Sequence, residues 1–112
     1  MTIFERIVAR EVPAEIVYEN EDILAFHDVN PQAPVHVLIV PKRVIPRLAE
    51  AQPADEKLLG KLLLAARTVG ASLDLETTGY RVVINNGKDA GETVPHLHVH
   101  LLGGRALGWP PG

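Results

Sequence analysis

The chain has 112 residues, of which 46% are apolar, and a formal net charge of −3. This length predicts one domain with a modest core, and this composition is typical of a globular protein. Cysteine is absent, which excludes structural disulfides, thiol nucleophiles and cysteine-ligated zinc. The basic residues form no stripe, so we expect no nucleic-acid partner.

The N-terminal residues do not resemble a targeting signal. Glu5 is among the first residues and no long apolar run follows it, so the pattern of a signal peptide is missing. No stretch approaches the ~20 apolar residues that a membrane span needs. We therefore expect a cytoplasmic protein without a membrane partner.

The first half of the chain predicts a short helix and three strands. Residues 3–8 alternate apolar and charged side chains at helical spacing. Residues 15–18 and 23–27 predict a hairpin, because two β-branched or apolar runs flank a polar turn. Residues 35–40 form a nearly continuous apolar run that ends at Pro41, which predicts a strand buried on both faces.

The second half predicts one long helix between strands. In residues 54–75, leucine, alanine and valine recur at steps of three and four, which is typical of a helix. Gly60 and Gly70 would let this helix approach a sheet closely. Residues 80–84 and 94–102 predict two further strands. We expect an α+β fold in which the helix covers one face of a mainly antiparallel sheet of about five strands.

Three of the five histidines lie in one pentapeptide, at positions 96, 98 and 100. Since successive side chains of a strand point to opposite faces, His96, His98 and His100 share one face. The alternating apolar residues share the other face and can pack under the helix: Leu97, Val99 and Leu101. Buried imidazoles need hydrogen-bond partners, so three of them favour a functional site over a purely structural edge.

Two kinds of chemistry fit this pattern. Neighbouring imidazoles at i and i+2 are ~6.8 Å apart and can share a metal ion, with His36, His27 or a carboxylate as the third ligand. Alternatively, one neutral imidazole is a nucleophile, whose second nitrogen must be held as N–H by an acceptor. A histidine-rich structural edge is the third interpretation.

The whole triad strand and several distant segments resemble one family. Residues 96–102 match the pattern His-φ-His-φ-His-φ-φ, where φ is apolar. Further matching segments follow in family order: Thr2-Ile3-Phe4, Phe26-His27-Asp28, Pro31-Gln32-Ala33-Pro34-Val35-His36, Val40-Pro41-Lys42, Gly79-Tyr80-Arg81, Leu102-Gly103-Gly104-Arg105 and Trp109-Pro110-Pro111-Gly112. The chain is similar to the histidine triad (HIT) superfamily, and in particular to its Hint branch of histidine triad nucleotide-binding proteins.

The resemblance implies a HIT fold over residues 1–112, with residues 103–112 as a C-terminal tail. It also implies a homodimer whose two five-stranded sheets join, and no cofactor. The implied reaction is hydrolysis of purine nucleoside 5′-phosphoramidates and acyl-adenylates to the nucleoside monophosphate, so the implied partner is a purine nucleotide derivative of AMP or GMP.

The resemblance assigns a role to each histidine of the site. His98 would attack phosphorus and form a nucleotidyl-histidine, while the carbonyl of His96 accepts its second N–H. His100 would contact the phosphate oxygens, and His36 would stand behind it in a proton relay.

The resemblance also implies the nucleotide contacts. Asp28 would bind the ribose hydroxyls, and Asn85 and Thr93 would lie near the phosphate. The base pocket would use the apolar side chains of Phe4, Val12, Phe26 and Val29. For Phe4 and Val12, ordinary core packing is an equal alternative. Trp109 would lie near the active site and against the partner subunit.

Two positions depart from the family pattern. Glu92 stands where the family usually has glutamine, and a carboxylate beside a phosphate repels it unless it is protonated or turned away. Pro95 replaces a common aromatic or aliphatic residue. Glu92 favours an alternative, a nucleotide-binding adaptor with weak catalysis. A dinucleoside polyphosphate hydrolase is a further alternative, against which the tail with Trp109 argues.

Overall fold

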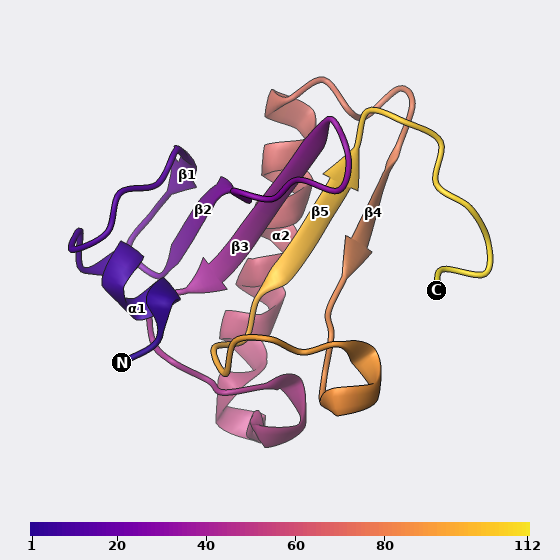
Figure 1. The fold of residues 1–112 in the computed structure, drawn as a ribbon. Coiled ribbons are helices and arrows are strands. Elements are labelled where there is room, and N and C mark those ends of the chain that lie inside the picture. The colour runs from indigo at the N-terminus through magenta and orange to yellow at the C-terminus, as the bar shows by residue number, and fades with distance from the viewer.

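The computed structural model describes residues 1–112, which form one five-stranded antiparallel sheet with the strand order β1-β2-β3-β5-β4 (Figure 1). The strands have these bounds: β1 Ile16–Glu19, β2 Ile23–His27, β3 Val35–Pro41, β4 Tyr80–Val83 and β5 Val99–Gly103. The short helix α1, Ile3–Val8, and the long helix α2, Glu56–Ser72, complete the fold. The predicted fold class is therefore confirmed. None of the helices combines the length and the apolar character that crossing a membrane requires.

The two helices pack on opposite faces of the sheet. Under α2 lies the larger core of 13 buried residues, with Val69 of the helix against Val37, Val99 and Leu101 of the strands. Under α1 lies a smaller cluster of six buried residues: Phe4, Ile7, Leu24, Phe26, Leu38 and Val40. Because α1 has only six residues, it covers one end of its face and leaves the rest open for a site.

Local signals fix α1 at its N-terminus. The Thr2 hydroxyl accepts the backbone N–H of Glu5 at 3.1 Å, and the Glu5 carboxylate accepts the N–H of Thr2 at 2.9 Å. This reciprocal capping box satisfies two backbone donors that a helix start leaves free. The helix is thereby placed so that Phe4 and Ile7 point into the sheet.

Helix α2 is shorter than the predicted range of 54–75. A 3-10 turn over Pro53–Asp55 precedes it, and it ends at Ser72. A Cβ on Gly70 would lie 2.8 Å from a ring carbon of Tyr80, so glycine permits the close approach of helix and strand there. A Cβ on Gly60 would meet nothing within 4 Å, so the same prediction for Gly60 is wrong.

Strand β5 begins at Val99, and the predicted range of 94–102 is wrong in its first half. Pro95 lacks the N–H that a strand would donate, and the N–H of His96 bonds to the carbonyl of Val94 at 2.8 Å in a tight turn. The N–H of Leu97 then donates to Ile45 at 2.6 Å. At the other end of the sheet, Pro41 does not stop β3 but occupies its last position, opposite Ile23.

Candidate active site

His98 has one nitrogen engaged and one nitrogen free for chemistry. Its Nδ1 lies 2.7 Å from the carbonyl oxygen of His96. A carbonyl only accepts, so this nitrogen carries the proton, and in the neutral ring Nε2 holds the lone pair. The ring is only 6% exposed and packs edge-on against Phe4, with the ring centres 4.9 Å apart. The backbone carbonyl of His96 thus holds His98 in the Nδ1-protonated tautomer, in which Nε2 can act as a nucleophile.

His96 is completely buried and bonded at both ring nitrogens. Its Nε2 donates to the carbonyl of Pro41 at 2.8 Å, and its Nδ1 lies 3.3 Å from the Thr2 hydroxyl, which donates to it. Burial lowers the pKa of His96, so the ring is neutral at neutral pH. The side chain of His96 therefore ties the N-terminus to β3, while its carbonyl serves His98.

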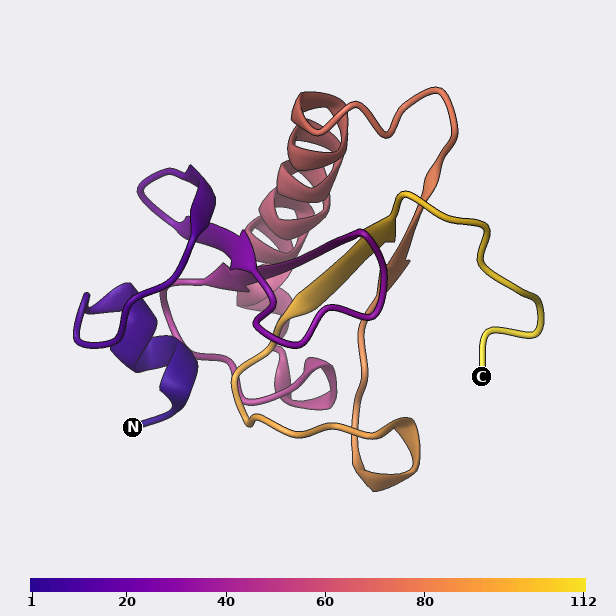
Figure 2. The same cartoon turned by 45° about the horizontal axis from the view of Figure 1, so that its top comes forward.

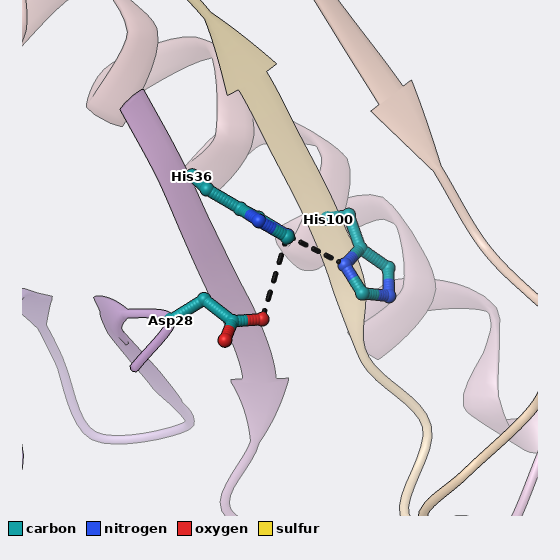
Figure 3. A group of neighbouring side chains, drawn as sticks. All are labelled: Asp28, His36 and His100. Carbon is teal, nitrogen blue, oxygen red and sulfur yellow. Dashed lines mark hydrogen bonds and ion pairs between the residues drawn. The ribbon is translucent and has the colours of Figure 1, made fainter. Parts of the chain in front are cut away.

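His36 and His100 form a directed pair across the neighbouring strands β3 and β5 (Figure 3). The backbone N–H of Gln32 donates to Nδ1 of His36 at 3.0 Å, so the proton of neutral His36 is on Nε2. This Nε2 lies 2.9 Å from Nδ1 of His100 and 3.5 Å from a carboxylate oxygen of Asp28. Nδ1 of His100 is consequently an acceptor, and His100 carries its own proton on Nε2.

Burial keeps both members of this pair neutral. It lowers the pKa of His36, against the opposing influence of the Asp28 carboxylate. It lowers the pKa of His100 to about 4, with further lowering from the neighbouring His98 and His36. At neutral pH the hydrogen bonds therefore connect neutral rings, each with a single ring proton.

Asp28, His36 and His100 have the side-chain types of a metal site, and their ligand atoms lie within 4.8 Å of one another. The sequence left open a metal site with His36 as the third ligand. In this arrangement Nε2 of His36 is the donor to His100, and Gln32 occupies the other nitrogen. Binding an ion would displace the only proton of a neutral imidazole, so these residues do not fit a resident metal ion.

A cavity of about 370 Å³ opens beside these histidines, between α1 and strands β2 and β3. Eight of its lining residues are site residues predicted from the sequence: Phe4, Val12, Phe26, Asp28, Val29, Thr93, His98 and His100. The others are Ile3, Ile7, Pro13, Ala14, His27, Leu38 and Val94. The wall is mostly apolar and carries a carboxylate and three imidazoles, those of His27, His98 and His100, which suits a flat apolar ligand with a polar end.

Five predicted site residues do not line this cavity. His36 and His96 stand behind the wall and act through His100 and His98. Asn85 and Glu92 belong to the segment before the triad, and Trp109 is 83% exposed in the tail. The predicted nucleotide contacts of Asn85, Glu92 and Trp109 stay predictions.

Glu92 is turned toward a cation that the sequence analysis missed. Its carboxylate accepts from Nε of Arg47 at 3.1 and 3.2 Å, from Nη2 at 3.1 Å, and from the N–H of Gly87 at 2.9 Å. These bonds lower the pKa of Glu92, which is ionised and neutralised by Arg47. No local sequence pattern predicts the ion pair of Arg47 and Glu92, which lie 45 residues apart in the chain. The carboxylate of Glu92 is thus ionised and already engaged by Arg47 and the Gly87 N–H.

Comparison with known proteins agrees with the fold and the histidine strand. The HIT domain family matches residues 9–107, and the chain belongs to this family. An uncharacterized HIT-like protein, slr1234 of Synechocystis, is 58% identical over 111 residues, which cover 99% of this chain and 96% of the relative.

Two solved structures illustrate the likeness. A HIT family hydrolase from Legionella pneumophila superposes with a TM-score of 0.98 at 42% identity, and each chain covers 100% of the other. A histidine triad nucleotide-binding protein from Candida albicans gives a TM-score of 0.84 at 30% identity, over 98% of this chain and 83% of that one. The protein thus has the fold of HIT family hydrolases.

Proposed function

We propose that this protein is a nucleotide hydrolase of the Hint branch, which cleaves purine nucleoside 5′-phosphoramidates and acyl-adenylates. One observation carries the proposal: the His96 carbonyl holds the proton of His98 on Nδ1, so that the Nε2 lone pair is free beside a nucleoside-sized cavity. Its likeness to a HIT family hydrolase supports hydrolysis, and its likeness to a histidine triad nucleotide-binding protein supports a nucleotide substrate.

The cavity provides a contact for each part of a nucleotide. The base packs among the apolar side chains, where Phe4 and Phe26 already pair edge to face with ring centres 5.6 Å apart. The Asp28 carboxylate is the only acidic group in the cavity wall, and it accepts the two ribose hydroxyls. This places the α-phosphate next to His98 and His100.

The reaction then proceeds in two displacements at phosphorus. Nε2 of His98 attacks, the P–N bond of the phosphoramidate breaks, and the amine leaves with the bonding electron pair and a proton from solvent. Water then attacks the nucleotidyl-histidine, its bond to Nε2 breaks, and the nucleoside monophosphate departs. Neutral His98 is regenerated. With an acyl-adenylate the bond broken in the first step is P–O.

His100 stabilises the charge that develops during both steps. Its proton on Nε2 donates to a phosphate oxygen, and His36 holds that proton in place from behind. The Thr93 hydroxyl provides a second donor in the cavity wall. Donors that are fixed before the reaction stabilise the transition state without reorganisation. The reaction needs no metal ion or cofactor.

We also propose that the protein works as a cytoplasmic homodimer in which the sheets of two subunits join. Strand β4 is an edge of the sheet, and Tyr80 and Val82 on it are each 37% exposed. Leu63 and Leu64 of α2 are each 53% exposed. Such apolar exposure at a free edge favours pairing with a second copy, which would also cover Trp109.

A substrate panel tests the proposed reaction. Adenosine and guanosine 5′-phosphoramidates, an acyl-adenylate and diadenosine triphosphate are assayed side by side, with and without a chelator. We expect rapid release of AMP and GMP from the phosphoramidates, unchanged by the chelator. Preference for diadenosine triphosphate would identify a dinucleoside polyphosphate hydrolase instead. Tight AMP binding without turnover of any substrate would identify a nucleotide-binding adaptor.

A further inference from the structure

The proton positions of the His36–His100 pair depend on one exposed loop. The N–H of Gln32 is the donor that makes Nδ1 of His36 an acceptor, and His36 in turn fixes His100. Gln32 belongs to residues 28–34, which connect β2 and β3 without regular structure. The Gln32 N–H on one side of the His36 ring and the Asp28 carboxylate, 3.5 Å from Nε2 on the other side, thus both favour a proton on Nε2.

Few contacts hold this loop in place. Within it, the Gln32 side chain donates to the carbonyl of Asn30 at 3.0 Å, and the N–H of Asn30 donates to Asp28 at 2.8 Å. Gln32 itself is exposed and Ala33 is the only buried residue of residues 28–34. A further bond holds the start of the loop, where the N–H of Asp28 donates to the carbonyl of His36 at 2.9 Å. None of these bonds engages the Gln32 carbonyl, whose direction depends on a donor from outside the loop.

This donor comes from the chain directly after the triad strand. Arg105 donates to the carbonyl of Gln32 from Nη2 at 3.0 Å and from Nε at 3.3 Å. Figure 2 shows the loop between β2 and β3 passing over β5 toward the start of the C-terminal segment. Two donors of one planar guanidinium fix the orientation of the carbonyl as well as its position.

Gly104 explains how Arg105 reaches the loop. Its φ is +89°, a conformation that L side chains rarely adopt, and the chain turns sharply there after β5. A Cβ on Gly104 would lie 2.9 Å from Cβ of Pro34, so only glycine lets the two segments pack this closely. The tail and the loop therefore meet at Gly104 and Pro34, with the guanidinium of Arg105 one residue further on.

We propose that Arg105 is a positioning residue for the site: by holding the Gln32 carbonyl, it restrains the backbone at Gln32 so that the N–H of the same residue stays directed at His36. The protons of His36 and His100 are thereby kept on Nε2, with that of His100 directed toward the substrate phosphate. This inference rests on the proposed function for its consequence in catalysis, but not for its structural content. Arg105 touches neither the cavity nor the reacting atoms. It acts through Gln32, His36 and His100 in sequence.

Nitrogen NMR of the histidine rings of the full-length protein tests this directly, because protonated and unprotonated ring nitrogens have well-separated shifts. In the wild type we expect unprotonated Nδ1 and protonated Nε2 in His36 and His100, and the opposite pattern in His98. In Arg105→Ala, signals of the Nδ1-protonated form should appear for His36 and His100, while His96 and His98 stay unchanged.

Kinetics of the same variants give the catalytic consequence. For adenosine 5′-phosphoramidate, Arg105→Ala should lower kcat roughly tenfold, about the worth of one hydrogen bond to a charged group, and leave KM within about twofold. Arg105→Lys keeps the charge but loses the paired donors, so its kcat should lie between those of the wild type and Arg105→Ala. Arg67→Ala is the control, because this exposed arginine lies on α2, on the other side of the sheet.

The outcomes separate the two proposals. Unchanged ring protonation in Arg105→Ala would overturn the role of Arg105, and so would equal changes in all four histidines, which indicate general loosening. A protonation change confined to His36 and His100 would support it even if the wild type hydrolysed no phosphoramidate, in which case only the proposed function fails. A lower kcat without a protonation change would also overturn it.

Discussion

The two faces of the sheet are built from the same strands and have opposite chemistry. Toward α2, Val99 and Leu101 of β5 are completely buried in an apolar core beneath a helix of 17 residues. Toward α1, His100 of the same strand and His98 directly before it border a cavity, because a helix of six residues covers only part of that face. Because side chains alternate along the segment, the apolar ones stabilise the core on one face and the histidines lie at the cavity on the other.

The polar face remains ordered because backbone groups satisfy its imidazoles. His98 and His96 donate to carbonyls, and His36 accepts from a backbone N–H. No buried side-chain nitrogen or oxygen is left without a partner. Since burying an unpaired polar group is costly, these bonds make the open face compatible with a stable fold. The same bonds also determine the tautomers of His98 and His36 that the proposed reaction requires.

The largest expected effect comes from the open face. Replacing His98 by alanine removes the attacking nitrogen, so turnover of adenosine 5′-phosphoramidate should fall about 10⁴-fold or more. AMP binding by calorimetry should change little, because the cavity wall keeps its other residues. A His98→Ala enzyme that kept most of its rate would show that His98 is not the nucleophile.

The covered face should give the opposite result. Leu101→Ala removes a side chain that is 0% exposed in the core under α2 and should lower the free energy of unfolding by about 2–5 kcal/mol. Urea denaturation measures this loss. At temperatures where the variant is folded, kcat should stay near the wild-type value. A large loss of kcat in folded protein would break the separation of the two faces.

The pH dependence of stability sharpens the comparison further. Burial lowers the pKa of His100 from its ordinary 6.5 to about 4 in the folded protein. Its stabilising contribution is therefore present above about pH 6.5 and is lost as the pH falls toward 4, because the unfolded chain takes up the proton first. This amounts to roughly 2–3 kcal/mol.

Melting measured between pH 4 and 7.5 tests this contribution. His100→Asn should flatten the curve, although His36 and His96 still contribute in the same direction, since burial also lowers their pKa values. A curve as steep in the variant as in the wild type would contradict the burial of a neutral His100.

The smallest effect is expected at the Arg47–Glu92 pair. Its bonds lower the pKa of Glu92, so the stabilisation exists above the unfolded pKa of about 4.3 and disappears as the pH falls below it. Arg47→Ala should lower the melting temperature slightly at pH 7 and by less at pH 3. Glu92→Gln, which keeps the shape and removes the charge, serves as the matched variant. An equal loss at both pH values would mean that the pair acts through packing alone.

Most of the fold could be predicted because its signals are local or periodic. The helix of residues 3–8, the hairpin and the alternation of histidine with leucine and valine all follow from side-chain spacing. The sequence pattern predicts the start of β5 too early, because the alternation of side chains continues through Pro95. The missing N–H of Pro95 and the turn at His96 prevent strand pairing before Val99. Here backbone chemistry outweighed the side-chain pattern.

The site could be predicted only as far as residue types reveal it. The histidines, Asp28 and Phe4 stand out in the sequence. The structure brings Asp28, Phe4, His98 and His100 to one cavity, with His36 and His96 behind its wall. Of the backbone groups that orient them, only the His96 carbonyl follows from the family resemblance, while the N–H of Gln32 and the carbonyl of Pro41 do not stand out. Backbone partners and a cation such as Arg47, 45 residues from its carboxylate, become visible only when the chain is folded.

The proposed reaction requires that Nε2 of His98 form a bond to phosphorus, and rapid quenching with mass spectrometry tests this most directly. The enzyme is mixed with adenosine 5′-phosphoramidate, quenched within one turnover, digested and sequenced by fragmentation. We expect one adenylyl group on the peptide that contains residues 96–102. It should be located on His98 and be absent in His98→Ala. An adduct on another residue, or AMP release with no adduct at any time, would contradict the proposed reaction.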